Sequence, residues 1–308
     1  MIQFEHVTKK YGATLALSDV SFHIKEGETV GLLGRNGAGK TTALNLAAGY
    51  FPPTEGVVRI GGRLMAAEGR ACRRRIGYLP EKPPLYGEMT VRDYLSFVCD
   101  LREVKPAGKA AHIAEILDLC GLADVPSRVL GHLSRGMRQR VGIAQALCGN
   151  PDILILDEPT VGLDPSQTAE MRQLIRALSQ DHTVIFSSHI LTEVQQLCPR
   201  VLLLDEGCLI RDMRIGAEAE ASPSSILLRV EGPASQLIPS LQNLPCVQQV
   251  KLIRESDGET ELSLNCIPPA TDQIFYLLAS LNAPIRMMRP EQENLEELFL
   301  SAVGQERT

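Results

Sequence analysis

Several patterns that would point to a particular class of protein are missing from this sequence. Its eight cysteines include no pair at CxxC spacing, and the closest two are Cys198 and Cys208. Zinc sites and thiol redox motifs therefore lack support. The residues that follow Met1 contain no apolar segment of the kind found in signal peptides. Scattered cysteines without a signal peptide are typical of a reducing cytosol, so we expect a cytoplasmic protein.

The sequence also lacks an apolar run long enough to cross a membrane. The longest notable uncharged stretch, residues 232–250, is interrupted by prolines and glutamines. We therefore expect a chain that is soluble by itself. The formal net charge of −6 gives no reason to expect nucleic acid as a partner. The notable basic cluster consists of Arg70, Arg73, Arg74 and Arg75. We interpret this cluster as a solvated face rather than an anion site.

Short apolar runs bounded by turn residues predict buried parallel strands at 29–34, 153–157, 183–188 and 201–207. Helical patterns separate these runs, which indicates an α/β domain with a parallel sheet. Between residues 90 and 150 the pattern changes to helices alone. Thr90 is the expected cap of the first, 108–120 is the second, and the third begins near Ser134.

A small, polar stretch at 216–224 predicts a linker between a first domain, residues 1–215, and an accessory domain, residues 225–308. The expected elements of the second domain are strand 225–231, helix 234–243, strand 246–254, strand 259–267, helix 271–282, strand 284–289 and a terminal helix at 292–302. The residues ESDGE supply a hairpin turn between the middle strands. The order βαββαβ predicts a small α+β, ferredoxin-like fold.

The sequence GRNGAGKTT follows the first predicted strand and precedes a helix. It satisfies the pattern G-x-x-x-x-G-K-[ST], in which backbone N–H groups and a helix N-terminus surround phosphates. Lys40 supplies charge for the β- and γ-phosphates, and the Thr41 hydroxyl binds Mg²⁺. The predicted nucleotide site consists of Gly34, Arg35, Asn36, Gly37, Ala38, Gly39, Lys40, Thr41 and Thr42.

Two carboxylates end the strand ILILDEP. Asp157 is suited to hold Mg²⁺ through water, as the acidic partner of a P-loop does. Glu158 lies just beyond the strand, where a carboxylate can orient or deprotonate an attacking water. The pair predicts hydrolysis of a nucleoside triphosphate.

With these motifs and LSRGMRQR at 133–140, residues 1 to about 215 resemble the nucleotide-binding subunit of an ABC transporter. The resemblance implies a P-loop NTPase fold of ABC type. Such a fold has a RecA-like core, an antiparallel β subdomain and a helical insert, here at about 88–150. By the same resemblance, Tyr11 would stack on adenine, Asp164 in GLDP belongs to the D-loop, and His189 in SSH is the switch histidine that contacts the γ-phosphate.

The segment LSRGM departs from the family signature LSGGQ at Arg135 and Met137 and retains Ser134 and Gly136. In the family this surface meets ATP bound by a second subunit. The resemblance therefore implies two ATP molecules between two cassettes arranged head to tail, and a homodimer satisfies that geometry. We expect the two substitutions to tune this contact rather than abolish it.

The proline-rich loop at 77–90 occupies the position of the family's glutamine-containing loop, with Glu81 in place of glutamine. The resemblance implies that this loop joins the ATP core to the helical insert and touches a membrane subunit. Glu81 either contributes to the Mg²⁺ site or only shapes the loop. The segments LPE, PPLY, MTVRDYL and LEELFL resemble the ABC-2 export branch, including gliding-motility-type ATPases.

These residues predict an ATPase that drives a separate polytopic permease from the cytoplasmic face of the membrane. Glu158 is the expected base, and Lys40 and His189 stabilise the phosphoryl charge. We expect the accessory domain to steady the dimer.

Two other functions would use the same motifs. A soluble ABC-type ATPase of DNA repair or translation carries a long coiled-coil insert or a second cassette, and neither is present. A regulatory module with negligible turnover is disfavoured by Glu158 and His189. A P-loop kinase or GTPase is disfavoured by the signature and the switch histidine.

Overall fold

The computed structural model describes residues 1–215, 224–256, 258–267 and 270–290. The backbone contacts divide the chain into two compact units, Met1–Met213 and Arg214–Thr308. Each unit has its own hydrophobic core.

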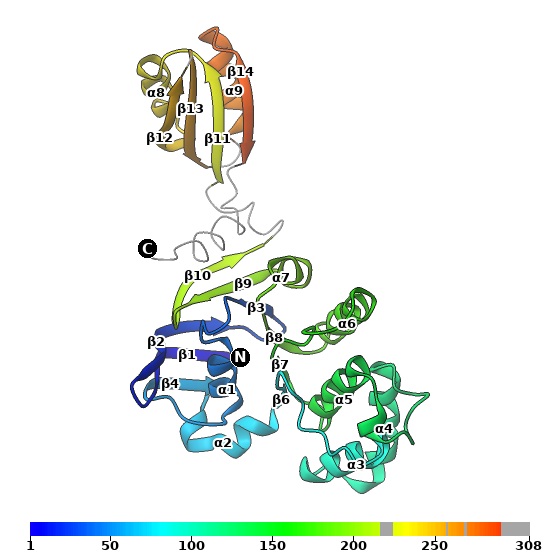
Figure 1. Ribbon diagram of the computed structural model, residues 1–308. Helices are drawn as coiled ribbons and strands as arrows, with labels where there is room; N and C mark the ends of the chain where they lie inside the picture. The colour runs from blue at the N-terminus through cyan, green and yellow to red at the C-terminus, as the bar shows by residue number, and fades with distance from the viewer. Residues whose placement is uncertain (216–223, 257, 268–269, 291–308) are drawn as a thin grey trace. The chain divides into compact units, whose positions relative to one another are not determined.

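A six-stranded sheet forms the centre of the first unit (Figure 1), with the strand order β10-β9-β3-β8-β7-β6. Its strands are β3 Thr29–Leu33, β6 Ile76–Leu79, β7 Ile153–Leu156, β8 Thr183–Ser188, β9 Arg200–Asp205 and β10 Cys208–Arg214. Strands β9, β3, β8, β7 and β6 pair in parallel. The predicted parallel sheet is therefore confirmed. Four of these strands (β3, β6, β7 and β8) are buried along their whole length, which explains their continuous apolar runs.

A second sheet of the first unit has the order β2-β1-β4-β5 and is antiparallel. Its strands are β1 Ile2–Tyr11, β2 Thr14–Ile24, β4 Glu55–Ile60 and β5 Arg63–Leu64. Helices α1 Lys40–Ala48 and α2 Met65–Arg74 pack with it. One continuous core joins this sheet, α1 and one face of the parallel sheet, so the loop before α1 lies on a rigid base.

The helical segment of the first unit contains α3 Val91–Leu101, α4 Pro106–Leu119, the short 3-10 helix Leu130–His132 and α5 Arg135–Leu147. The Thr90 hydroxyl accepts a hydrogen bond from the Asp93 N–H, and the Ser134 hydroxyl accepts one from the Met137 N–H. The predicted cap at Thr90 and the predicted start of a helix near Ser134 are confirmed. Helix α5 packs on β6, α7 Leu191–Leu197 packs on β3 and β8, and α6 Pro165–Leu178 packs on α7.

The second unit has the elements β11 Ser224–Glu231, α8 Ala234–Gln242, β12 Val247–Ser256, β13 Glu259–Cys266, α9 Thr271–Ser280 and β14 Ile285–Pro290. Its sheet has the order β12-β13-β11-β14, and all its pairs are antiparallel. The element order agrees with the βαββαβ prediction. On α9, Ile274 and Leu278 are buried in the core of this unit, and Leu277 and Leu281 pack against it.

Some predicted segments lie outside the described residues, and some elements of the structure were not predicted. Of the predicted linker at 216–224, residues 216–223 lie outside the described residues and Ser224 already belongs to β11; the terminal helix predicted at 292–302 also lies outside them. Helix α2 and strand β6 were not predicted. Strand β6 ends at Leu79, directly before Pro80, and is the last strand of its sheet, where a following proline breaks no ladder.

No helix within the described ranges is both long and apolar enough to cross a bilayer.

Candidate functional site

The predicted site residues lie at one edge of the parallel sheet. The neighbouring strands β3, β8, β7 and β6 end in register there, since Leu33 pairs with Ser188 and Leu156 pairs with both Phe186 and Leu79. The P-loop follows β3, His189 follows β8, the two carboxylates follow β7, and Glu81 follows β6 shortly after Pro80. Ligand sites of open α/β sheets form outside these carboxyl ends.

The P-loop closes tightly because of its glycines. Gly39 has φ 101° and precedes α1, and a Cβ there would lie 2.7 Å from the Ala16 carbonyl oxygen. The buried Lys40 ammonium folds back on the loop, donating to the carbonyl oxygens of Gly34 at 2.8 Å and Arg35 at 3.1 Å. The Lys40 ammonium and the N-terminus of α1 thus lie together at this loop, which suits an anionic ligand.

Asp157 is a buried carboxylate with one free oxygen. Its Oδ1 accepts a hydrogen bond of 2.6 Å from the Ser187 hydroxyl, whereas its buried Oδ2 has no hydrogen-bond partner. Burial raises the pKa of Asp157, the Ser187 and Thr41 hydroxyls lower it, and the nearby charges of Glu158 and Glu81 raise it. An unpaired buried carboxylate oxygen beside the P-loop threonine is a suitable ligand position for a hard cation.

Glu158 occupies the left-handed backbone region at φ 48°, and its N–H donates to Ser187 Oγ at 2.9 Å. This conformation is uncommon for a residue with a side chain and requires support from its surroundings. The carboxylate is buried, with Oε1 3.3 Å from Lys40 Nζ. The turn therefore places this second carboxylate beside the P-loop lysine.

The His189 ring lies beside the same carboxylate. Its Nδ1 is 2.9 Å from Glu158 Oε2, and its side chain is 40% exposed. A carboxylate can only accept, so Nδ1 carries the proton of this hydrogen bond and Nε2 is left for another partner. The structure thus brings together Lys40, Glu158 and His189, the three residues predicted to act in catalysis.

The loop that contains Glu81 lies against the helix that follows Ser134. A Cβ at Gly142 of α5 would lie 2.5 Å from Leu79 Cδ1 and 2.9 Å from Pro83 Cγ, so the loop and the helix are in close contact. Glu81 itself is exposed, yet its charge contributes to the raised pKa of Asp157. Glu81 therefore lies near enough to Asp157 to act on it electrostatically.

The signature residues and the D-loop adjoin each other. A Cβ at Gly162 would lie 2.2 Å from the Arg135 guanidinium carbon, and a Cβ at Gly136 would lie 2.8 Å from Gln167 Oε1. Asp164 caps α6 by accepting the Gln167 N–H at 2.9 Å. Ser134 is exposed and Met137 half-buried. These residues form one surface that is exposed at Ser134 and Asp164.

Tyr11 ends β1 and is 45% exposed, with its ring edge-on to Phe51 and the Lys9 ammonium 5.2 Å from its centroid. The face of an exposed aromatic ring can stack on a nucleobase. In the part of the chain that the structure describes, the ring contacts of Tyr11 are with Phe51 and Lys9 and not with Lys40.

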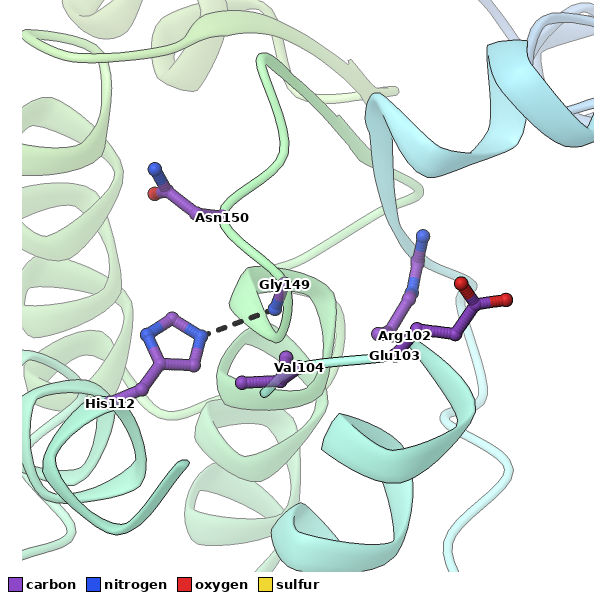
Figure 2. A pocket seen from close by; sticks show the side chains of 6 residues that line it. All are labelled: Arg102, Glu103, Val104, His112, Gly149 and Asn150. Carbon is purple, nitrogen blue, oxygen red and sulfur yellow. Dashed lines mark hydrogen bonds between the residues drawn. The ribbon is translucent and has the colours of Figure 1, made fainter. Parts of the chain in front are cut away.

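A separate hollow of about 260 Å³ lies between α3, α4 and the turn after α5 (Figure 2). Its lining residues are Arg102, Glu103, Val104, His112, Gly149 and Asn150. The Gly149 N–H donates to His112 Nε2 at 3.1 Å.

Glu103 pairs with Arg70 and Arg74, while Arg75 pairs with Asp152. Arg70, Arg74 and Arg75 of the basic cluster thus form ion pairs at the surface, and Arg73 donates to the Gly49 carbonyl oxygen, in agreement with the interpretation as a solvated face.

Ser187 is a site residue that the sequence did not reveal. It joins Asp157 and Glu158 to β8 through one donated and one accepted hydrogen bond. The signal was the polar end of TVIFSS, since two fully buried serines close an otherwise apolar strand.

Among the described residues, no group of three or more histidine, cysteine or acidic side chains could hold a metal by itself. A cation here would need oxygen ligands from its nucleotide as well.

Comparison with known proteins identifies the family. The model for the ABC transporter family matches residues 17–161. The chain is 40% identical to the uncharacterized ABC transporter ATP-binding protein YxlF of Bacillus subtilis, over 98% of this chain and 99% of that protein. The chain belongs to the ABC transporter ATP-binding proteins. It is an ATPase subunit that binds ATP.

Two further similarities concern this ABC subunit. It is 33% identical to the Nod factor export ATP-binding protein I of Burkholderia thailandensis, over 99% of this chain and 97% of that protein. A solved dimer of the ATP-binding cassette MJ0796 bound to ADP and Pi superposes with a TM-score of 0.65 and 28% identity, covering 70% of this chain and all of that one. The P-loop NTPase fold predicted from the sequence is confirmed.

Proposed function

We propose that this ABC subunit hydrolyses ATP to drive an ABC-2-type export permease encoded separately. The observation that carries the proposal is the cluster of Lys40, Glu158 and His189 at the carboxyl edge of the sheet. The ABC-2 assignment rests on the loop sequence around Glu81, and the export direction is supported by the similarity to a Nod factor export protein.

In this proposal, Glu158 orients and deprotonates the attacking water, since its carboxylate is held between Lys40 and His189. Lys40 exchanges its loop carbonyl partners for phosphate oxygens when ATP binds. His189 supports the charge that develops on the γ-phosphoryl group. Hydrolysis is then an in-line transfer to water that depends on positioning and on charge neutralisation.

The donor set around Asp157 fits Mg²⁺. The free Oδ2 of Asp157 and the Thr41 hydroxyl are hard oxygen donors, and Mg²⁺ in such sites also uses substrate phosphates. When bound, the ion would neutralise charge on the β- and γ-phosphates. Glu81 either adds to this site or shapes its loop.

Two copies of the subunit, arranged head to tail, would enclose two ATP molecules. The γ-phosphate bound by the other copy would face Ser134, together with Arg135, Gly136 and Met137. Helix α5 begins at this segment, so the positive end of the helix dipole lies at Ser134. The dimer of the MJ0796 cassette, with ADP and Pi, supports this arrangement. Asp164, on the adjoining surface, would lie in the same interface.

The loop at 77–90 is the proposed contact with the permease. Tyr86 of this loop is 52% exposed, and its ring lies edge-on to the buried Tyr94 ring and to the partly exposed Phe97 ring. Tyr86 and Phe97 therefore give the loop an aromatic surface. Such a surface suits a partner that buries apolar side chains. Attachment there would place the subunit at the cytoplasmic face of the membrane.

The test is recovery of partners with the tagged, full-length subunit from detergent-solubilised membranes. The expected result is a polytopic membrane protein with the wild type and reduced recovery with Tyr86→Ala, at unchanged ATP affinity. Glu115→Ala, on the exposed face of α4, is the matched control. Recovery of ribosomes or DNA in place of a membrane protein would overturn the proposal.

A further inference from the structure

Glu193 is a buried carboxylate that the proposed mechanism does not use. It lies in the first turn of α7 and is 5% exposed. Its Oε2 accepts two hydrogen bonds, one of 2.8 Å from Thr160 Oγ1 and one of 2.9 Å from Ser188 Oγ. A buried carboxylate is retained in a fold only when its surroundings compensate the charge, and here two hydroxyl donors do so.

The two donors belong to the two loops that carry the reacting groups. Thr160 follows Glu158 by two residues and is itself buried. Ser188 ends β8, directly before His189, and its hydroxyl also accepts the Ile190 N–H at 3.0 Å. Both chain neighbours of His189 are therefore fixed by this network, although its ring remains partly exposed.

Ser187 makes a second connection between the same loops, through Asp157 and the Glu158 N–H. Ser187 holds the start of the turn that contains Asp157 and Glu158. Glu193 holds Thr160, later in the same turn, and connects it to Ser188, the residue before His189. Without Glu193, the Thr160 and Ser188 hydroxyls would lose their common acceptor, and the described contacts between the two loops would reduce to Ser187 and the Glu158–His189 pair.

We propose that Glu193 is a positioning residue that sets the distance between Glu158 and His189 during ATP hydrolysis. This inference rests on the proposed function of those two residues. Glu193 acts through hydrogen-bond geometry: one oxygen accepts both bonds, and the amide oxygen of a glutamine can accept the same two donors. Charge at this position is therefore dispensable, whereas the acceptor is not.

The test compares Glu193→Leu with Glu193→Gln in the full-length protein, measuring kcat, ATP affinity and unfolding temperature. Glu193→Leu is expected to lower kcat about 10- to 100-fold per folded molecule, the loss that a displacement of about 1 Å produces, while ATP affinity changes little. Glu193→Gln is expected to restore most of kcat. Equal losses of kcat in both variants would overturn the role of geometry, and a lower unfolding temperature with unchanged kcat would show a structural role only.

Thr160→Val keeps the test decisive if Glu193→Leu does not fold, because it removes one donor with little change in shape. It should lower kcat in the same direction, and an unchanged kcat would contradict the proposed network. Where Glu193→Leu folds, the Thr160→Val/Glu193→Leu double variant should fall no further than Glu193→Leu alone. Multiplicative losses would contradict a shared network. Failure of the proposed function itself is distinguishable, since Glu158→Gln would then retain turnover whatever Glu193 does.

Discussion

His189 Nδ1 lies 2.9 Å from Glu158 Oε2, although 31 positions separate the two residues in the chain. Their pairing is a consequence of parallel strands: β7 and β8 are neighbours, Leu156 at the end of β7 pairs with Phe186, and β8 continues to Ser188, so Glu158 and His189 meet at the same edge. The same carboxylate contacts Lys40 through its other oxygen. A single buried glutamate thereby connects Lys40 of the P-loop to His189.

Replacing Lys40 by alanine should weaken ATP binding by at least about tenfold, equivalent to about 1.4 kcal/mol. The ammonium is the buried cation nearest the P-loop carbonyls, and its loss also leaves Glu158 without its cationic partner. Titration with ATP by calorimetry measures the change. Lys109→Ala is the control, because Lys109 pairs with Asp100 in the helical segment. Unchanged affinity in Lys40→Ala would contradict the assigned nucleotide site.

His189→Ala should lower kcat about 10²- to 10³-fold, the usual effect of removing one group that stabilises a developing charge. ATP affinity should change far less, since the ring is partly exposed and contacts Glu158 rather than the P-loop. Steady-state phosphate release measures the effect. His6→Ala, which removes an exposed ring paired with Asp19, should retain full turnover. A loss confined to ATP affinity would argue against the switch role.

Glu81→Gln should raise several-fold the Mg²⁺ concentration needed for half-maximal hydrolysis, because the Glu81 charge acts on Asp157. The measurement is turnover against free Mg²⁺ at saturating ATP. Glu88→Gln, an exposed residue of the same loop, is the matched control. Identical Mg²⁺ titrations for Glu81→Gln and wild type would assign Glu81 to shaping the loop alone.

Asp157→Asn should stabilise the metal-free protein while removing Mg²⁺-dependent hydrolysis. Burial raises the pKa of Asp157, so between the unfolded and folded pKa values the folded chain binds more protons than the unfolded chain. Stability therefore falls as pH rises through that interval, and the uncharged amide removes this loss. An increase in unfolding temperature of about 2–4 °C at neutral pH is expected for about 1 kcal/mol. A lower unfolding temperature in metal-free buffer would contradict the account of Asp157.

The sequence was informative where an apolar run lay between turn residues. Apolar runs predicted the parallel strands that end at the P-loop, Asp157 and His189. The cap at Thr90 and the helix start near Ser134 were also predicted. Strand β6 was missed because its four residues are bounded by a proline-rich loop, so no turn signal separated them from it.

The contacts that support the site could not be read from the sequence. Thr160, Ser187, Ser188 and Glu193 are ordinary polar residues in the sequence, and only the pairing of β7 with β8 brings them together. The contact of Arg135 with Gly162 likewise depends on how α5 and α6 pack. Three-dimensional arrangement, rather than residue type, gives these residues their partners.

The central claim, that Glu158 carries out hydrolysis between paired subunits, is tested most directly with Glu158→Gln. Phosphate release and molar mass by light scattering are measured with saturating Mg²⁺ and ATP, with Glu115→Gln as the control. The account predicts retained ATP binding, turnover reduced about 10²- to 10⁴-fold, and a stable dimer that forms only with ATP. Turnover comparable to wild type, or a monomer with bound ATP, would contradict it.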